Sequence, residues 1–262
     1  MAEGPKKRID CVLIAGGKYH DIDFARLELL KLLAEDERIR VRVFEDYSNL
    51  SAIAAADFLV SYTCDVIPSL VEQEALRAFV ERGGRWYALH GTNSILRFLQ
   101  NGLVDSPRWA PHFMETLGSM FVAHPPIAPY RVTVADPDHA LVRDVKPFEA
   151  TDELYLSEYY GHLHVLLETE FEGQATGFVE SSWRKAKHPV FYLHPIGNGA
   201  VLYLTLGHCR GHYDMQPLMD FYPVPEKGSW ALPVFYDLLR RGIAWAREPS
   251  LRAMAQGPAA AG

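Results

Sequence analysis

The sequence contains few cysteines and no long hydrophobic run. Cys11, Cys64 and Cys209 are widely spaced and form no C-x-x-C pair, which argues against a disulfide framework and against a thiolate zinc site. No segment approaches the roughly 20 consecutive apolar residues of a membrane-spanning helix. The polar, basic start of the chain is not followed by the apolar segment that an export signal contains. We therefore expect a cytoplasmic protein without a membrane partner.

The chain also has no excess of basic residues. The chain has 26 basic and 33 acidic residues and a formal net charge of -7, which disfavours nucleic acid as the main partner. Neither a G-x-x-x-x-G-K-[ST] loop nor a G-x-G-x-x-G turn after a strand is present, so nucleotide binding is disfavoured. The G-x-S-x-G motif is absent too, and a hydrolase that uses Ser94 or Ser119 ranks last. These observations favour an uncharged or weakly charged small molecule as the ligand.

The length and composition favour one domain. With 262 residues, 48% of them hydrophobic, the chain can bury one large core, and α/β domains of this size commonly stay undivided. We expect a single domain over residues 9–247. The flanking residues 1–8 and 248–262 are expected to be flexible, since the second segment is rich in Ala, Gly and Pro.

The first part of the domain alternates between strand and helix patterns. Short apolar runs indicate buried strands, and apolar residues at helical spacing indicate the helices between them. Expected strands lie at 9–15, 41–44, 58–62 and 85–89, and expected helices at 21–34 and 68–80. This alternation predicts a parallel sheet that is covered by helices on both faces.

Beyond Gly118 the pattern changes to shorter β-rich runs. Alternating apolar and polar residues indicate antiparallel additions to the sheet. We expect them at 130–134, 164–167, 175–179 and 190–193, followed by an apolar strand at 200–206 and a closing helix at 232–245.

The 11 histidines are the most informative polar residues, because most of them stand at the ends of expected strands. The carboxyl ends of parallel strands meet at one edge of the sheet, where ligands gather. His20, Asp21 and His90 lie in such loops, and His208 ends the strand at 200–206. An imidazole there can act as a general acid or base, bind a metal or contact a sugar hydroxyl.

A group of acidic and aromatic residues follows position 151. If this segment is extended, Glu153 and Tyr155 face one side and Asp152 faces the other. Glu153 is the preferred base, and Glu158 is a further candidate. The competing interpretation is a solvated acidic loop.

Aromatic residues in the expected loops favour a carbohydrate partner, because a ring face can stack on the C–H face of a sugar. They are Tyr19, Trp109, Tyr155, Tyr159, Tyr160 and Tyr213.

Several segments, in the same order along the chain, resemble the ThuA-like (trehalose utilisation) family of the class I glutamine amidotransferase-like superfamily. They are GKYHD at 17–21, GGRWYALHG at 83–91, DELY at 152–155 and GNGAVLYLTLGH at 197–208, with support from LGSMFVAHP at 117–125 and GIAWA at 242–246. The resemblance implies a flavodoxin-like three-layer sandwich with a mostly parallel central sheet and antiparallel additions. It also implies a link to the catabolism of trehalose or related disaccharides, alongside oxidation of the sugar to a 3-keto form.

The chain departs from the amidotransferase and family patterns at two places. His90 stands where amidotransferases carry a cysteine nucleophile, and no cysteine is near it in the sequence, so thiol-dependent glutamine hydrolysis is not expected. The family's His-Pro-Ile element is represented by Asp138-His139-Ala140-Leu141, without its proline. We interpret His139 as structural, and also His194, which precedes a hairpin turn at 197–199.

The leading hypothesis is an enzyme that acts on a trehalose-related or 3-keto sugar by hydrolysis, elimination or isomerisation. The catalytic candidates are Glu153, His208 and His90, and the substrate-binding candidates are His20, Asp21, His124, Tyr155, Glu158 and Tyr159. Zinc, manganese or iron on the histidines and Glu153 is an open alternative to metal-free acid–base chemistry. The competing function is a non-catalytic carbohydrate-binding or regulatory module. The sequence does not decide whether the protein forms homo-oligomers.

Overall fold

The structure is a computed structural model that describes the backbone of residues 8–256 and the side chains of residues 8–250. The expected flexible segments at residues 1–7 and 257–262 lie outside the described residues. Among the helices of the described part, none has both the length and the apolar character needed to cross a membrane.

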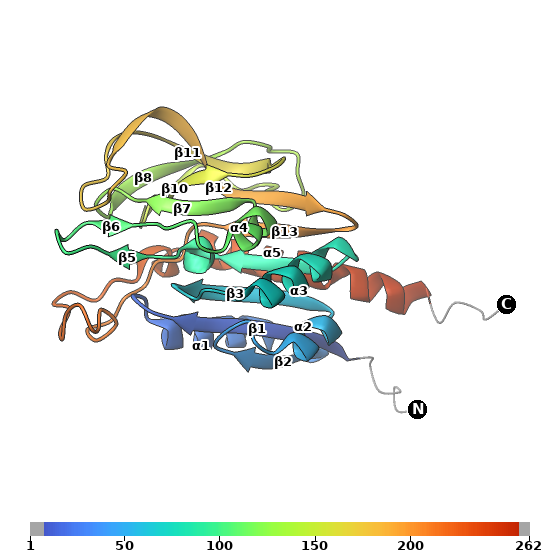
Figure 1. Ribbon diagram of the computed structural model, residues 1–262. Helices are drawn as coiled ribbons and strands as arrows, with labels where there is room; N and C mark the ends of the chain where they lie inside the picture. The colour runs from blue at the N-terminus through green and yellow to red at the C-terminus, as the bar shows by residue number, and fades with distance from the viewer. Residues whose placement is uncertain (1–7, 257–262) are drawn as a thin grey trace.

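A nine-stranded sheet with the order β2-β1-β3-β4-β13-β12-β11-β8-β9 forms the centre of the molecule (Figure 1). Its first five strands are parallel. They are β2 (Ile39–Phe44), β1 (Ile9–Gly17), β3 (Phe58–Cys64), β4 (Arg85–Leu89) and β13 (Gly199–Leu204). This is the 2-1-3-4-5 order of flavodoxin-like folds, in which ligands bind outside the carboxyl ends of the strands.

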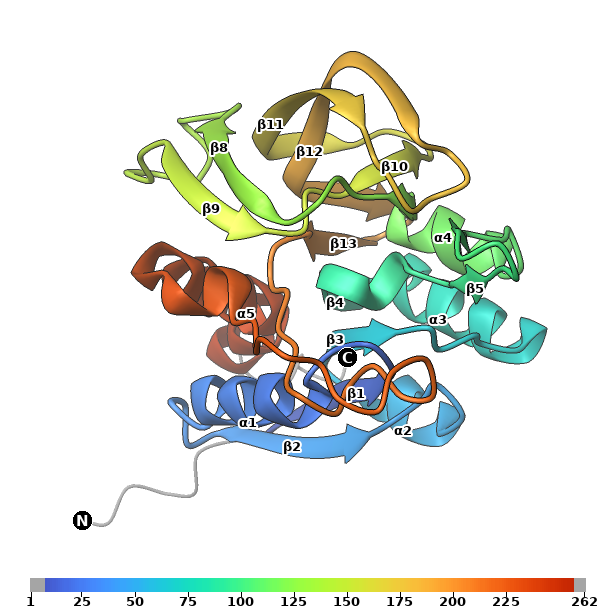
Figure 2. The ribbon, with the colours of Figure 1, turned by 90° about the vertical axis from the view of Figure 1, so that its left-hand side faces the viewer.

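Helices cover both faces of the parallel half (Figure 2). One apolar core lies between the sheet and the helices α1 (Ile22–Leu33) and α5 (Pro233–Gln256). A second core lies on the opposite face under α2 (Leu50–Ala55), α3 (Leu70–Glu81) and α4 (Pro111–Leu117). Strands buried on both faces explain why the sequence of β1 and β3 is almost continuously apolar.

The antiparallel half of the sheet follows β13. It consists of β12 (Ser182–Ile196), β11 (His164–Gln174), β8 (Ala128–Val134) and β9 (Phe148–Asp152). Two small sheets lie beside it, one of β7 (Ser119–Ala123) and β10 (Leu156–Tyr159), the other of β5 (Arg97–Phe98) and β6 (Val104–Asp105). Short 3-10 helices follow β4 and precede α5, at η1 (His90–Asn93) and η2 (Gly228–Ala231).

The fold class predicted from the sequence is confirmed, and the largest local differences concern two segments. The expected strand at 175–179 is a turn that makes a single bridge, Val104 to Phe178. Helix α5 does not end near residue 245 but continues through Pro249 to Gln256. Glu248, expected in the flexible tail, pairs with Arg85. A proline and small residues in the sequence favoured an end there, but polar contacts of Arg247 with Asp36 and of Ser250 with Asp57 also hold this part of the helix.

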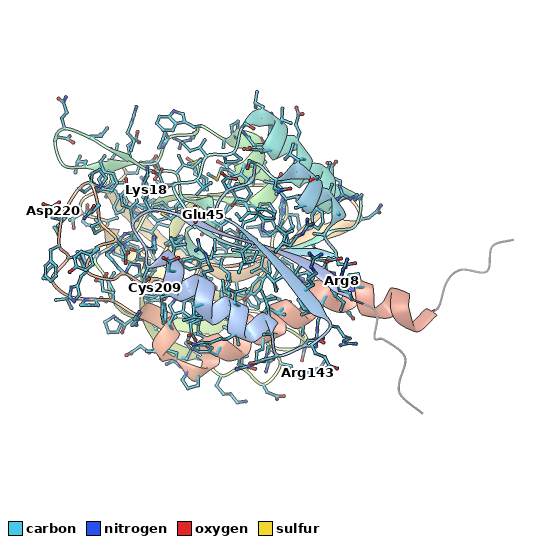
Figure 3. All side chains as sticks on the ribbon, turned by 90° about the horizontal axis from the view of Figure 1, so that it is seen from below. Arg8, Lys18, Glu45, Arg143, Cys209 and Asp220 are labelled. Atoms are coloured by element: carbon cyan, nitrogen blue, oxygen red, sulfur yellow. The ribbon has the colours of Figure 1, made fainter. Side chains whose placement is uncertain are left out.

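The carboxyl ends of the parallel strands face away from the chain termini. Figure 3 shows Lys18, after β1, and Cys209, after β13, on the side of the molecule that also carries Asp220. Arg8, at the start of β1, lies at the opposite end. The loops with the histidine candidates therefore converge at one end, as the topology predicts.

Candidate functional site

The loops at the carboxyl ends of β1, β3 and β4 have unusual backbone conformations. Tyr19, Asp65 and His90 have φ angles of 69°, 58° and 44°, a region that costs free energy for residues other than glycine and that clusters at functional sites. His90 directly follows β4, and the next residue, Gly91, leaves no room for a side chain because a Cβ there would lie 2.7 Å from the Thr63 carbonyl oxygen. The sharp turn places the His90 imidazole at the edge of the sheet.

His90 and His20 face each other there. Both side chains are buried, and their Nε2 atoms lie 2.9 Å apart. The other ring nitrogen of each faces a backbone carbonyl: Nδ1 of His90 lies 2.8 Å from the Thr205 oxygen, and Nδ1 of His20 lies 3.4 Å from the Lys18 oxygen. The hydroxyl of Tyr155 lies 3.3 Å from Nε2 of His90.

Asp152, at the end of β9, connects the antiparallel half of the sheet by hydrogen bonds to the loops at the carboxyl ends of the parallel strands. Its buried carboxylate accepts hydrogen bonds from the backbone N–H groups of Glu153, Gly207, His208 and Ser229, at 2.8, 3.1, 3.1 and 2.8 Å. One side chain therefore joins the end of β9, the loop after β13 and the start of η2. This arrangement fixes Glu153 and His208 relative to each other.

Glu153 is the centre of the site. Its side chain is only 4% exposed and meets five basic groups. The nearest atoms are His208 Nδ1 at 3.0 Å, His90 Nε2 and Arg210 Nη2 at 3.4 Å, His124 Nε2 at 3.5 Å and His20 Nε2 at 3.7 Å. Asp152 and Glu153 point to different sides, as expected for adjacent residues of an extended segment.

The charges of this cluster shift several pKa values. Burial raises the pKa of Glu153, but the nearby His208 and His124 bring it well below its usual range. Burial also opposes the charge of His208, yet Glu153 and the hydrogen bond to Glu226 raise the pKa of His208 to about 9. Burial lowers the pKa of His20 to about 3. Glu153 is therefore a carboxylate, and His20 is neutral, at neutral pH.

A cavity of about 260 Å³ opens at this cluster. Ligand pockets commonly measure about 300–1,000 Å³, so this cavity suits a small ligand. Its polar lining includes Tyr19, His20, His124, Glu153, Tyr155 and Arg210, and its apolar lining includes Phe98, Phe121 and Phe178. His208 does not line the cavity and lies behind Glu153.

The structure brings most of the sequence-derived candidates together. Glu153, His208, His90, His20, His124 and Tyr155 form one cluster. His139 and His194 lie elsewhere. Both ring nitrogens of His194 face backbone carbonyls, those of His162 and Glu115.

Three candidates lie outside the cavity. Asp21 caps α1 by accepting a hydrogen bond from the Phe24 N–H. Glu158 pairs with Arg108 and accepts a hydrogen bond from Tyr160 at the surface, and Tyr159 is beside it. Glu158 and Tyr159 lie there because β10 pairs antiparallel with β7 and leads the chain away from the site after Tyr155. The structure therefore does not place Asp21, Glu158 or Tyr159 at this cavity.

The serines considered for a hydrolase are not activated by a histidine within the described residues. The Ser94 hydroxyl lies 3.5 Å from the Tyr155 hydroxyl. Ser119 is buried between Asn93 and Tyr192.

Sequence reasoning missed two charged residues of the site. Arg210 contacts Glu153 and donates to the Tyr19 carbonyl. Glu226 accepts hydrogen bonds from Nε2 of His208 at 2.7 Å and from Arg210 at 3.0 Å. Both residues lie in a polar loop that contains no recognisable motif. Reciprocal backbone hydrogen bonds between Arg210 and Glu226 bring them together in the fold.

Four residues of the cluster could hold a metal ion. One potential ligand atom from each of His20, His90, Glu153 and His208 lies within 4.8 Å of all the others.

Comparison with known proteins agrees with this fold. A family model described as ThuA, trehalose utilisation, matches residues 12–222. The chain belongs to the ThuA family. Among curated proteins, none matches it.

Solved structures of similar fold include two ThuA-like proteins. Those from Bacteroides uniformis and Parabacteroides merdae have TM-scores of 0.64 and 0.58 and identities of 17% and 18%. The alignments cover 94% and 92% of this ThuA chain, and 94% and 90% of theirs. A β-galactosidase from Bacillus circulans has a TM-score of 0.52 at 14% identity, over 95% of this chain but only 32% of its own. At such identities, the likeness shows the fold alone.

The contacts of Asp152 lead to a prediction about stability. We expect Asp152→Asn to lower the free energy of unfolding by about 1.5–3 kcal/mol, because an amide replaces the charged acceptor of several buried N–H groups. Chemical denaturation measures the change. The control is Glu158→Gln, whose surface pair with Arg108 contributes about 1 kcal/mol or less. Equal effects of the two substitutions would contradict the role assigned to Asp152.

Proposed function

We propose that this ThuA protein is an enzyme that moves protons on a sugar or keto-sugar derived from trehalose or a related glycoside. The observation that carries the proposal is a buried carboxylate, Glu153, at the wall of a small cavity beside a second proton-transfer group, His124. The family's link to trehalose utilisation supports the substrate class.

His124 is the imidazole best placed to reach a ligand. Its side chain is 22% exposed, whereas those of His90 and His208 have no exposed area. Nδ1 donates a hydrogen bond to the Pro125 carbonyl oxygen at 2.8 Å, so Nε2 is the nitrogen that faces Glu153. We assign proton transfer to His124 together with Glu153.

A ketone on the sugar ring makes the reaction accessible to such groups. The carbonyl at C3 acidifies the C2–H bond, so a positioned base can remove that proton and form an enolate. In elimination, the electron pair forms the C1=C2 bond, the C1–O bond to the leaving sugar breaks, and the leaving oxygen takes a proton. Addition of water completes a hydrolysis, and return of the proton to another face or atom gives an isomer. Removal of the C2 proton is therefore the common first step.

The remaining cavity wall suits a sugar. Tyr19, Phe98, Phe121 and Phe178 line it, and aromatic rings can pack on the C–H face of a pyranose. Tyr155 and Arg210 offer hydrogen-bond donors near Glu153. The combination favours a polar, uncharged ligand over an apolar one.

The direct test is incubation of the full chain with 3-keto-trehalose and related 3-keto glucosides in D2O. We expect exchange of the C2 proton for deuterium above the rate without enzyme, together with a change in the glycosidic bond, both followed by NMR. Unoxidised trehalose should show neither effect. Binding of the 3-keto sugars with no exchange and no product, with or without added Zn²⁺, Mn²⁺ or Fe²⁺, would instead show a binding module.

A further inference from the structure

We propose that His20, His90, Glu153 and His208 bind one divalent transition-metal ion. The ligand atoms lie within 4.8 Å of one another and are buried. Three residues come from the loops after β1, β4 and β13, and Glu153 comes from the loop after β9. The inference is drawn from the direction of their nitrogen lone pairs and does not depend on the substrate proposed above.

Each of the three imidazoles has one nitrogen that faces Glu153 and one that faces away from it. The hydrogen-bond partner of the nitrogen that faces away determines which nitrogen carries the hydrogen. A carbonyl oxygen can only accept a hydrogen bond, so Nδ1 of His90, 2.8 Å from the Thr205 oxygen, is the protonated nitrogen. The same argument assigns the proton of His20 to Nδ1, which faces the Lys18 oxygen. Nε2 of His208 donates to the Glu226 carboxylate at 2.7 Å. The nitrogens of His20 and His90 that face Glu153 therefore carry lone pairs. Nδ1 of His208, 3.0 Å from the Glu153 carboxylate, releases its proton when it binds an ion.

The ring nitrogens that face Glu153 converge on one point. Nε2 of His20 and Nε2 of His90 lie 2.9 Å apart. The buried Nδ1 of His208 has no hydrogen-bond partner, although Oε1 of Glu153 is 3.0 Å away. Electron pairs held this closely in a buried site repel one another. A cation among them turns the repulsion into coordination.

The outer contacts also match those of metal-bound histidines. Such residues almost always donate their second N–H to a carboxylate, a backbone carbonyl or water, which fixes the ring. Here the Lys18 and Thr205 carbonyls and the Glu226 carboxylate serve the three rings. Arg210, which also contacts Glu226 and Glu153, holds the two carboxylates in place.

The ligand set indicates the class of ion. Three imidazole nitrogens and one carboxylate oxygen suit zinc, iron or manganese, whereas calcium and magnesium prefer oxygen ligands. Bonds of about 2.0–2.2 Å place two ligands of one ion at most about 4.4 Å apart, so the widest separation in the cluster must contract slightly on binding. His20 and Glu153 also line the cavity, so a ligand in the cavity can reach the ion.

The test uses the purified full chain after treatment with a chelator. Co²⁺ is added first, because its visible absorption reports binding by nitrogen and oxygen ligands, and Zn²⁺ is then used to displace it. We expect saturation at one ion per chain. His90→Gln and His208→Gln should abolish saturable binding at this site, with folding checked by circular dichroism.

A second variant keeps the test decisive if those substitutions impair folding. Glu226→Gln preserves shape but removes the carboxylate behind His208, and we expect it to weaken binding by about 10–100-fold. His164→Ala is the matched control, since it removes an exposed histidine that pairs with Asp136 away from the site. His124→Ala should still bind one ion.

Two results would overturn the proposal. One is a folded protein that binds no stoichiometric Co²⁺ or Zn²⁺. The other is binding that is lost with His164→Ala but not with the His90 and Glu226 substitutions. Metal binding without turnover of keto-sugars would refute only the proposed function. Full turnover by the metal-free protein, with no binding, would refute only the metal site.

Discussion

Replacing Glu153 with Gln is expected to reduce turnover of the keto-sugar by on the order of 10²–10⁴-fold, the usual contribution of a positioned acid or base. Glu153 is the only carboxylate that faces four imidazoles and Arg210 within the described part of the cavity. An amide has nearly the same shape but cannot take up a proton or neutralise the surrounding positive charge. Steady-state kinetics with a 3-keto glucoside measures the loss.

The same substitution should also reduce stability, and this effect must be separated from catalysis. The charge on Glu153 raises the pKa of His208 to about 9 and compensates Arg210. Breaking a buried ion pair at one partner costs about 3–5 kcal/mol. Glu153→Asp is the matched control, because it keeps the charge but withdraws the carboxylate by one methylene. If a folded Glu153→Asp protein kept near-normal turnover, the exact location of the carboxylate would not matter. That result would contradict the proposed role of Glu153 in proton transfer.

The parallel half of the fold was predictable because its signals are local. The apolar runs that become β1, β3 and β4 have nearly the expected bounds. The start of α1 was marked by Asp21, which caps it. The antiparallel half depends on pairing between distant segments, which single-sequence patterns report poorly. For this reason the long strand β12 was recognised only in its most apolar part, and a turn at 175–179 was mistaken for a strand.

The histidines of the site were predictable from topology. Once β1, β4 and β13 are parallel strands of one sheet, His20, His90 and His208 must stand at one edge of it. Glu153 is different, since it follows β9 at the far side of the sheet order. It was found from the resemblance of the DELY segment and from the alternation that directs Asp152 elsewhere. Its distance from the histidines could not be derived from either.

The missed and misplaced residues have a common cause. Glu226 reaches His208 from a loop that packs across the strand ends, and nothing in its sequence neighbourhood indicates this contact. Glu158 and Tyr159 were placed in the site because they are close to Glu153 in sequence, but β10 turns away to pair with β7. The direction of a chain after a loop is set by tertiary pairing, and proximity in sequence does not reveal it.

The position of His90 explains how the site differs from that of an amidotransferase. Its φ of 44° and the close approach of Gly91 keep the sharp turn after the strand. An imidazole now occupies that turn, and its Nε2 faces His20 and Glu153 rather than an open substrate cavity. The turn thus directs an imidazole nitrogen into the buried cluster, at the position where the sequence resemblance would place a thiol.

His124→Ala is expected to lower kcat by about 10²–10⁴-fold with a smaller change in KM, because a proton-transfer group acts mainly in the transition state. Folding should be little affected, since the ring is partly exposed and contacts the cavity residues Phe121 and Phe178 at its edge. The variant enlarges the cavity where the imidazole stood. Added imidazole should therefore enter and restore part of the turnover, and His164→Ala, which makes no such space, should show no response.

The two roles considered for His124 give opposite kinetic results. If it only holds a sugar hydroxyl, as the sequence suggested, the substitution should raise KM and leave kcat nearly unchanged. If it transfers the proton, deuterium exchange at C2 should slow in parallel with kcat, while the stoichiometry of bound metal stays at one. This separation follows from geometry: Nε2 of His124 lies 3.5 Å from Glu153 but outside the group of four close ligand atoms. His124 therefore lies beside the cavity without belonging to the proposed ligand set, and its substitution tests proton transfer separately from metal binding.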